Sequence, residues 1–162
     1  MHESSHETAI TIRPAQRAEQ ALLVSMIRAG RLNPLGLDWR RFLVAEQQPG
    51  HVVGCIQRKD HAGEVRELAS LYVQPRWRQK GIASALVNEL MKRTAPPLWL
   101  TCRERLTGFY EHFGFEVVEL PAEMPGYFRA AWRLFRILRF VLAGRDGLAV
   151  MRYEPRSNQA GT

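Results

Sequence analysis

The sequence predicts a mixed α/β fold around a central sheet, because strand-like and helix-like segments alternate along the 162 residues. The clearest transition lies within residues 65–93. Residues 65–73 are rich in apolar and β-favouring types, and Pro75 then ends the strand. From Ile82 onward, apolar residues recur at the three- and four-residue steps of a helix face. A strand, a tight basic turn and a helix are therefore predicted in direct succession.

The first elements follow from local signals. Residues 10–13 are predicted as a short strand that Pro14 ends, and residues 15–28 as a helix that Gly30 ends. Residues 31–39 are predicted as a loop or short helix. The residues expected on the inward face of the first helix are Ala18, Ala21, Leu22, Met26 and Ile27.

The next elements are bounded by turn residues. Segments 42–46 and 51–58 are predicted as paired strands, because Gln48, Pro49 and Gly50 form a turn between them. His61, Ala62 and Gly63 form the next turn, which leads into the strand of residues 65–73.

After the helix of residues 82–93, Pro96 and Pro97 break the chain. Residues 98–102 are predicted as a buried strand and residues 106–113 as a helix that ends at Gly114. A strand over 115–120, a long helix over 127–143 and a strand over 148–153 complete the alternation.

Length and composition are those of an ordinary globular protein, with 46% apolar and 24% charged residues. We expect one domain over residues 10–155, with flexible tails at 1–9 and 156–162. No run of 18 apolar residues predicts a transmembrane helix, and residues 1–9 lack the apolar core of a secretory signal.

Two cysteines, Cys55 and Cys102, lie in apolar, strand-like surroundings. Their spacing suggests neither a disulfide framework nor a metal site. Buried free thiols in a reducing compartment are expected, so the sequence predicts a cytoplasmic protein without a metal cofactor.

A net charge of +7 favours an anionic partner, which could be a phosphorylated cofactor, an acidic protein, nucleic acid or an anionic membrane. The net charge does not distinguish among these partners, and a high net charge also favours solubility. A nucleic-acid partner is not expected, because the sequence contains no recognised nucleic-acid-reading motif.

The most informative cluster of charge lies where the strand of residues 65–73 gives way to the next helix. Arg78, Lys80 and Gly81 occupy this turn. A helix N-terminus has unpaired N–H donors and a positive dipole end, and glycine lets the backbone come close to a ligand. The pattern predicts an anion site suited to a diphosphate, although a solvated turn can have the same composition.

These residues resemble those of the GNAT superfamily of acyl-CoA-dependent N-acetyltransferases. The segment Arg78-x-x-Gly81-x-Ala83 is similar to the pyrophosphate motif of the family. Phe109-Tyr110 followed by Gly114-Phe115 resembles its aromatic signature at the end of the third helix, and Ile12 to Ala15 is a typical start. The resemblance covers residues 10–155. One departure is Arg103, at a position where the family often has asparagine.

The resemblance implies a GNAT-type acyltransferase fold, in which helices flank a central, twisted and mostly antiparallel sheet. Where the family usually has a short connection before the last strand, this chain has an extra basic amphipathic helix. It implies acetyl-CoA as co-substrate and a primary amine as acceptor, on a protein or a small molecule. A non-catalytic acetyl-CoA-binding regulatory module is the alternative. The implied cofactor-binding residues are Leu71, Tyr72, Val73, Arg76, Arg78, Gln79, Lys80, Gly81, Ile82 and Ala83.

Two residues are candidates for proton transfer. Glu67 lies eleven residues before Arg78, the spacing of the catalytic glutamate in the histone-acetylating branch of the family. Alternation along the strand places it on an apolar face with Val65 and Leu71, where a buried carboxylate could act as base. The alternative is that Glu67 pairs with an arginine, such as Arg66, or with solvent. Tyr110 is the candidate acid, because a phenol is protonated at neutral pH; the alternative is a purely packing role.

The acceptor side is expected to involve residues 31–39 and 121–147. Asn33, Asp38 and Trp39 are weak candidates for acceptor binding, and Asp38 more readily caps a helix that begins at Trp39.

The helix of residues 127–143 carries a stripe of arginines on an otherwise apolar background. Packing on the sheet, with the arginines in water, is favoured. A lid, a homodimer surface or peripheral contact with an anionic membrane are the alternatives. The stripe consists of Arg129, Arg133, Arg136 and Arg139.

Overall fold

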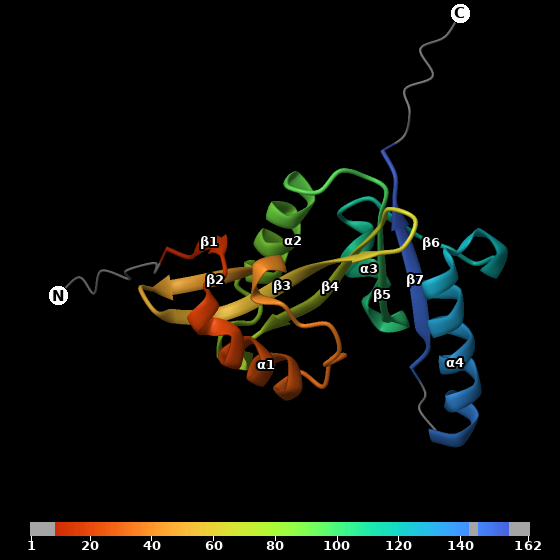
Figure 1. Cartoon of the computed structure of the whole chain (residues 1–162), viewed down its shortest axis with the longest axis horizontal. Coiled ribbons are helices and arrows are strands. Elements are labelled where there is room, and N and C mark those ends of the chain that lie inside the picture. Colours follow the sequence, from red (N-terminus) through yellow and green to blue (C-terminus); the bar gives the residue numbers. More distant parts are fainter. Residues whose placement is uncertain (1–8, 143–145, 156–162) are drawn as a thin grey trace, which may run out of the picture. The chain divides into compact units, whose positions relative to one another are not determined.

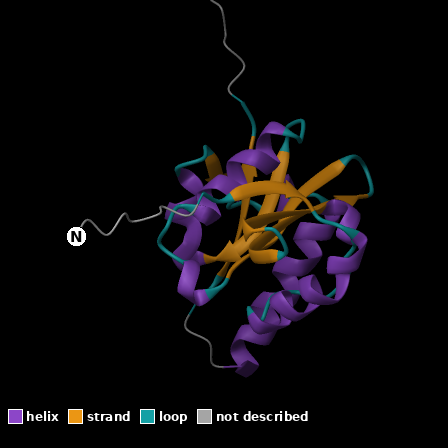
Figure 2. Cartoon of the chain, turned by 90° about the vertical axis from the view of Figure 1, so that its left-hand side faces the viewer, coloured by secondary structure: helices purple, strands orange, loops and turns teal. Residues whose placement is uncertain are grey.

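The computed structural model describes residues 9–142 and 146–155 and confirms the predicted fold class. Within these residues, seven strands hydrogen-bond in the order β1-β2-β3-β4-β5-β7-β6, accompanied by four α-helices (Figures 1 and 2). Except for Ala9, the predicted tails lie outside the described residues. None of the helices described is both long and apolar enough to cross a bilayer.

The chain forms two compact units. The first comprises the residues up to Arg58 together with Ser70–Arg93, and the second comprises Lys59–Ala69 and the residues from Thr94 onward. Strands β3 and β4 contribute residues to both. A single domain over residues 10–155 stays a prediction.

The first unit contains two α-helices, two complete strands and parts of two further strands. Its elements are β1 (Thr11–Pro14), α1 (Gln20–Ala29), β2 (Phe42–Gln48), the first part of β3 (His51–His61), the end of β4 (Val65–Val73) and α2 (Ile82–Lys92). Antiparallel pairing sets Arg13 opposite Val44 and Val44 opposite Cys55. The strand predicted over 65–73 has these bounds in the structure.

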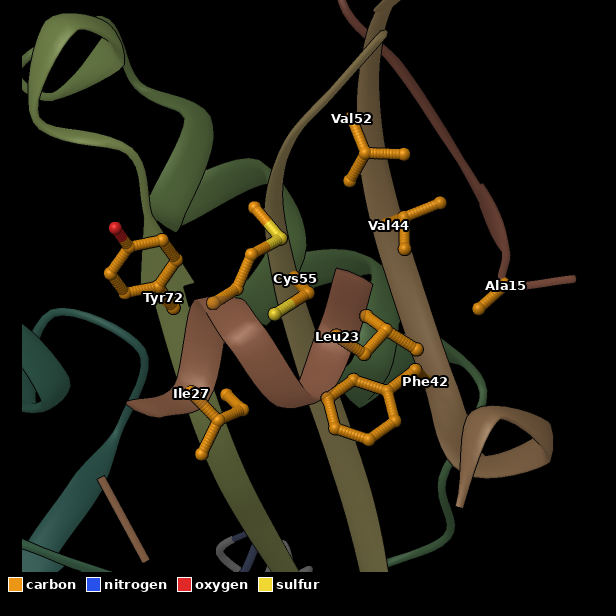
Figure 3. Packing of buried hydrophobic residues seen from close by; sticks show 9 residues of the cluster. Ala15, Leu23, Ile27, Phe42, Val44, Val52, Cys55 and Tyr72 are labelled. Carbon is orange, nitrogen blue, oxygen red and sulfur yellow. The ribbon is translucent and has the colours of Figure 1, made fainter. Parts of the chain in front are cut away.

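Helix α1 packs on this sheet through Leu23, Met26 and Ile27, which bury against Phe42 and other apolar residues of the strands (Figure 3). The predicted inward face is correct for Met26 and Ile27 and wrong for Ala18, Ala21 and Leu22, which are exposed. The reason is that residues 17–19 form a 3-10 turn and α1 begins only at Gln20, so the buried face runs through other positions.

Helix α2 covers the opposite face of the same strands. Tyr72 belongs to the cluster under α1. On the other face, a Cβ added at Gly54 of β3 would lie 3.3 Å from the side chain of Val73 in β4 and 3.3 Å from that of Leu86 in α2. Neighbouring residues of a strand point to opposite faces, so Tyr72 and Val73 face different helices. The end of β4 is therefore held from both sides at the point where the basic turn begins.

A charged network ties β1 to β2 in this unit. Arg13 hydrogen-bonds Glu46 and Glu19, at 2.7 Å in each ion pair. The pKa of Glu46 is lowered to about 2, mainly by the hydrogen bonds from Arg13 and to a smaller extent by the hydrogen bond from the Gly50 N–H. The hydrogen bond from Arg13 also lowers the pKa of Glu19.

We expect Arg13→Met to lower the melting temperature by a few degrees at pH 7, and by progressively less at acid pH. Carboxylates whose pKa is depressed in the folded state stabilise it above their unfolded pKa of about 4.5 and lose this contribution as the pH falls towards 2. Melting curves from pH 7 to pH 2 measure the difference from the wild type. A difference in melting temperature as large at pH 2 as at pH 7 would contradict this account. Arg17→Met, at an exposed arginine, is the control and should melt like the wild type.

The second unit contains β5 (Leu98–Arg103), α3 (Thr107–Glu111), β6 (Phe115–Val117), α4 (Gly126–Leu142) and β7 (Leu148–Tyr153). Strand β5 pairs in parallel with β4, with Glu67 opposite Trp99, and antiparallel with β7. The predicted helix over 106–113 is shorter, because a 3-10 turn occupies residues 104–106. The predicted strand over 115–120 ends at Val117, shortly before the 3-10 turn that begins at Pro121.

Helix α4 lies beside β7 (Figure 1) and packs through Phe128 and Trp132 on a cluster that includes Trp99 and Val150. Packing on the sheet is thus confirmed. Arg133 and Arg136 are exposed, and Arg136 lies 4.6 Å from the Trp132 ring centroid. Arg129 is partly buried and donates to the Met124 carbonyl at 2.9 Å. The side chain of Arg139 lies outside the description.

Candidate functional site

The basic turn after β4 leaves the start of α2 open. The Gln74 N–H bonds the Val53 carbonyl at 2.9 Å, and residues 75–77 form a 3-10 turn. Gln79 and Gly81 adopt left-handed φ values of 60° and 76°. The first intrahelical bond runs from the Ala85 N–H to the Gly81 carbonyl, so α2 does not itself use the N–H groups of residues 82–84.

The surroundings of this helix start fit an anionic group. A Cβ placed on Gly81 would meet no atom of the described residues within 4 Å, so the approach to the backbone is open. Arg76, Arg78 and Lys80 are exposed around it. Arg78 Nε donates to the Val73 carbonyl at 3.0 Å, which ties this side chain to the end of β4. Lys80 Nζ lies 4.8 Å from the Trp77 ring centroid.

A cavity of about 380 Å³ lies next to the same turn, between α1 and the end of β4. Tyr72, Gln74 and Arg76 line it on the β4 side, and Leu22 and Met26 line it on the α1 side. The cavity therefore combines an apolar wall with one of the exposed cations.

Strand β4 is irregular just before this turn. Ser70 has a left-handed φ of 57°, which is rare for a non-glycine residue in a strand and typical of a bulge. The regular alternation that places Glu67 on one face with Leu71 is therefore interrupted at Ser70. The Tyr72 side chain is part of the core under α1 (Figure 3) and also lines the cavity.

Glu67 is buried, as the sequence predicts for a carboxylate on an apolar face. The predicted alternative, an ion pair with an arginine, is not what the structure shows: Glu67 Oε2 lies 2.7 Å from His61 Nε2. Burial raises the pKa of Tyr127, and the charge of Glu67 raises it further. Burial lowers the pKa of Lys59, and the charge of Glu67 opposes that shift.

Sequence reasoning missed His61, which it placed only in a turn. The available signal was the hairpin itself: β3 ends at His61 and β4 begins at Val65, so the end of one strand and the start of the next lie together. It also missed Tyr127, whose ring stacks on His61 with 3.8 Å between centroids. No short-range pattern could link these two residues.

Tyr110 lies on α3 in a buried, aromatic environment. Its ring makes edge contacts with Phe109 and Phe115, at centroid distances of 5.0 and 6.1 Å. Burial raises the pKa of the phenol above its ordinary value, and the electrostatic interaction with Cys102 acts in the same direction. The hydroxyl is therefore protonated throughout the physiological range and can donate a proton.

The weak acceptor-side candidates have local structural roles. Asp38 Oδ1 accepts from the Arg40 N–H at 3.1 Å and caps the 3-10 turn that begins at Trp39, which confirms the capping alternative. Asn33 Oδ1 accepts from the Leu35 N–H at 3.0 Å in the same way. Trp39 packs partly buried on the core under α1.

The structure also gives the surroundings of Arg103 and of the two cysteines. Arg103 is exposed, 3.9 Å from Asp146. Both cysteines are free and buried, as predicted, and burial raises the pKa of each thiol to about 12. Across residues 9–142 and 146–155, no group of three or more histidine, cysteine or acidic side chains is arranged to bind a metal ion.

A family model described as an acetyltransferase (GNAT) domain matches residues 38–117. No curated protein sequence gives a significant match. Among solved structures, an N-acetylglutamate synthase from Neisseria gonorrhoeae, complexed with coenzyme A and N-acetyl-glutamate, is 18% identical with a TM-score of 0.68. The match covers 91% of this chain and 36% of that one, so this chain spans about a third of the synthase.

Two similar structures have nearly the length of this chain. A Mycobacterium tuberculosis protein in complex with CoA is 20% identical with a TM-score of 0.66, over 88% of this chain and 98% of that one. A GNAT-family acetyltransferase from Staphylococcus aureus is 14% identical with a TM-score of 0.64, and the match covers 90% of this chain and 98% of that one. These similarities establish the fold. The family model identifies residues 38–117 of this chain as a GNAT acetyltransferase domain.

Proposed function

We propose that this protein is an N-acyltransferase that moves an acetyl group from acetyl-CoA to a primary amine. The observation that carries the proposal is the open start of α2, with the left-handed Gly81 and three exposed cations, within the matched domain. This turn suits the diphosphate of CoA. The neighbours crystallised with CoA support the same reading.

Individual residues would have separate roles in binding acetyl-CoA and in transferring the acetyl group. Bound acetyl-CoA would supply an activated acyl group as a thioester. Arg76, Arg78 and Lys80, with the N–H groups at the start of α2, would hold its diphosphate. The backbone N–H of Leu71 is a candidate donor to the carbonyl that becomes negative during attack.

Proton transfer would fall to Glu67 and Tyr110. A lysine-type amine has a pKa near 10.4, so only roughly one molecule in a few thousand is neutral at pH 7. Glu67 would accept a proton from the amine. Tyr110 would return a proton to the departing thiolate, since its phenol stays protonated.

The direct test is release of CoA thiol from acetyl-CoA by the purified protein with a panel of amines. The panel contains L-glutamate and other amino acids, polyamines, aminoglycosides and lysine peptides; L-glutamate is included because two of the similar structures are N-acetylglutamate synthases. Acceptor-dependent release supports the enzyme and names its acceptor class. If acetyl-CoA raises the melting temperature but no amine promotes release, the regulatory module becomes the better reading.

For Tyr110→Phe we expect kcat to fall on the order of 100-fold, while the dissociation constant of acetyl-CoA changes little. The substitution removes the proton donor and keeps the buried ring that contacts Phe109 and Phe115. Steady-state kinetics and calorimetric titration measure the two quantities. A loss confined to affinity or to melting temperature would indicate that Tyr110 only packs.

A further inference from the structure

Helix α4 has an exposed apolar stripe in addition to the face that packs on the sheet. Phe128 and Trp132 belong to the packed face. Leu134 and Ile137 are 58% and 66% exposed, among the most exposed large apolar side chains of the residues that the structure describes. Ala130 is exposed as well, and it precedes Leu134 by four residues, as Leu134 precedes Ile137 by three, so the three side chains share one face of the helix. We call Ala130, Leu134 and Ile137 the outer stripe; packing on the sheet does not account for it.

Two exposed arginines border the outer stripe along one side. Arg133 and Arg136 each precede a residue of the stripe by one position, which is about 100° around the helix axis. The guanidinium of Arg136 lies 4.6 Å from the ring centroid of Trp132, at the edge of the packed face. The sequence of α4 contains four arginines and no acidic residue. The exposed surface of this helix therefore has an apolar strip and a cationic strip side by side.

An anionic lipid bilayer has the same two layers in the same arrangement. Its negatively charged headgroups lie directly above apolar acyl chains, so a helix in the plane of the interface can insert aliphatic side chains while its arginines stay among the phosphates. A second copy of the chain fits less well. Docking of two copies through the outer stripe would bring their arginines together, and α4 has no acidic side chain to pair with them.

We propose that the outer stripe, with Arg133 and Arg136, is a docking surface for an anionic phospholipid membrane. Leu134 and Ile137 insert among the acyl chains, and the two guanidinium groups lie at the level of the lipid phosphates. Phe128 and Trp132 stay packed on the sheet, so docking does not require α4 to leave its unit. This surface is separate from the residues proposed for acetyl transfer, and its test does not depend on that activity.

The test is co-sedimentation of the full chain with two kinds of vesicle, one of phosphatidylcholine alone and one of phosphatidylcholine mixed with phosphatidylglycerol. We expect binding to the vesicles that contain phosphatidylglycerol, little binding to those without it, and weaker binding at high salt, which screens the arginines. Equal binding to both kinds of vesicle, or binding to neither, overturns the proposal.

Two double variants separate the cationic strip from the apolar one. Arg133→Gln with Arg136→Gln should weaken binding to the anionic vesicles roughly 30-fold, since each basic residue near such a surface contributes about a factor of five. Leu134→Gln with Ile137→Gln keeps the net charge and should weaken binding at least about 10-fold, because its side chains no longer favour the acyl layer. All four side chains are exposed, so both variants should keep the wild-type melting temperature.

Matched controls lie outside α4. Arg17→Gln with Arg28→Gln removes the same charge from exposed positions in the first unit, and Leu35→Gln replaces a leucine that is 72% exposed. Both controls should bind the anionic vesicles nearly as the wild type does. A loss in the controls as large as in the α4 variants would assign the binding to the net charge of the whole chain, and it overturns the docking surface.

A fluorescent label gives a readout at the stripe itself. Both native thiols are buried with pKa values of about 12, so an environment-sensitive dye would react with a new cysteine at Ile137→Cys. Its emission should shift to shorter wavelength on anionic vesicles, whereas the same dye at Leu35→Cys should not shift. If neither label shifts, and light scattering shows dimers that Leu134→Gln with Ile137→Gln separates, the stripe binds a second copy and the membrane proposal is wrong.

Discussion

Gly81→Glu is expected to abolish acetyl-CoA binding, with a dissociation constant at least about 100-fold above that of the wild type. The new carboxylate would stand at the open start of α2, where the backbone has no neighbour of the described residues within 4 Å of an added Cβ. It would repel a diphosphate there and attract Arg78 and Lys80 away from it.

Gly81→Gln is the matched control, because it has the same size and the same backbone penalty without the charge. The left-handed φ of 76° costs any side chain about 1–2 kcal/mol, so both variants should melt at a similarly lowered temperature. Calorimetric titration with acetyl-CoA separates them: the glutamine variant should retain measurable binding and the glutamate variant should not. Wild-type affinity in Gly81→Glu would show that the diphosphate does not bind here.

Glu67→Gln is expected to lower kcat/KM by about 100- to 1,000-fold without changing the affinity for acetyl-CoA. Glutamine fills the same buried space and can still accept a hydrogen bond from His61, but it cannot accept the proton of the amine. Initial rates from pH 6 to pH 9, with the best acceptor of the panel, give the comparison. Full turnover across this range would exclude Glu67 as the base.

Glu64→Gln is the control for this substitution. Glu64 lies in the turn of the same hairpin, with an exposed side chain. It loses an equal charge three residues from Glu67, so it should retain wild-type turnover. A comparable loss in both variants would assign the effect to the charge or stability of the hairpin.

The sequence alone determined the elements whose signals are local. The strand over 65–73 and the helix that begins at Ile82 follow from β-favouring residues, Pro75 and helical spacing. The structure has the same strand bounds and begins the helix at the same residue. Gly81 marks the turn because it adopts a left-handed conformation that side chains avoid. The segment that fits a diphosphate was therefore predictable, since its geometry is set by residues close in the chain.

The surroundings of Glu67 could not be predicted from local sequence signals. His61 reaches it across the β3–β4 hairpin, and Tyr127 comes from a helix sixty residues further along the chain. The inward face of α1 and the interruption of β4 at Ser70 were likewise not predictable from periodicity. These features depend on contacts between segments far apart in the sequence, and packing of such segments overrides local preference because it contributes most of the free energy of folding.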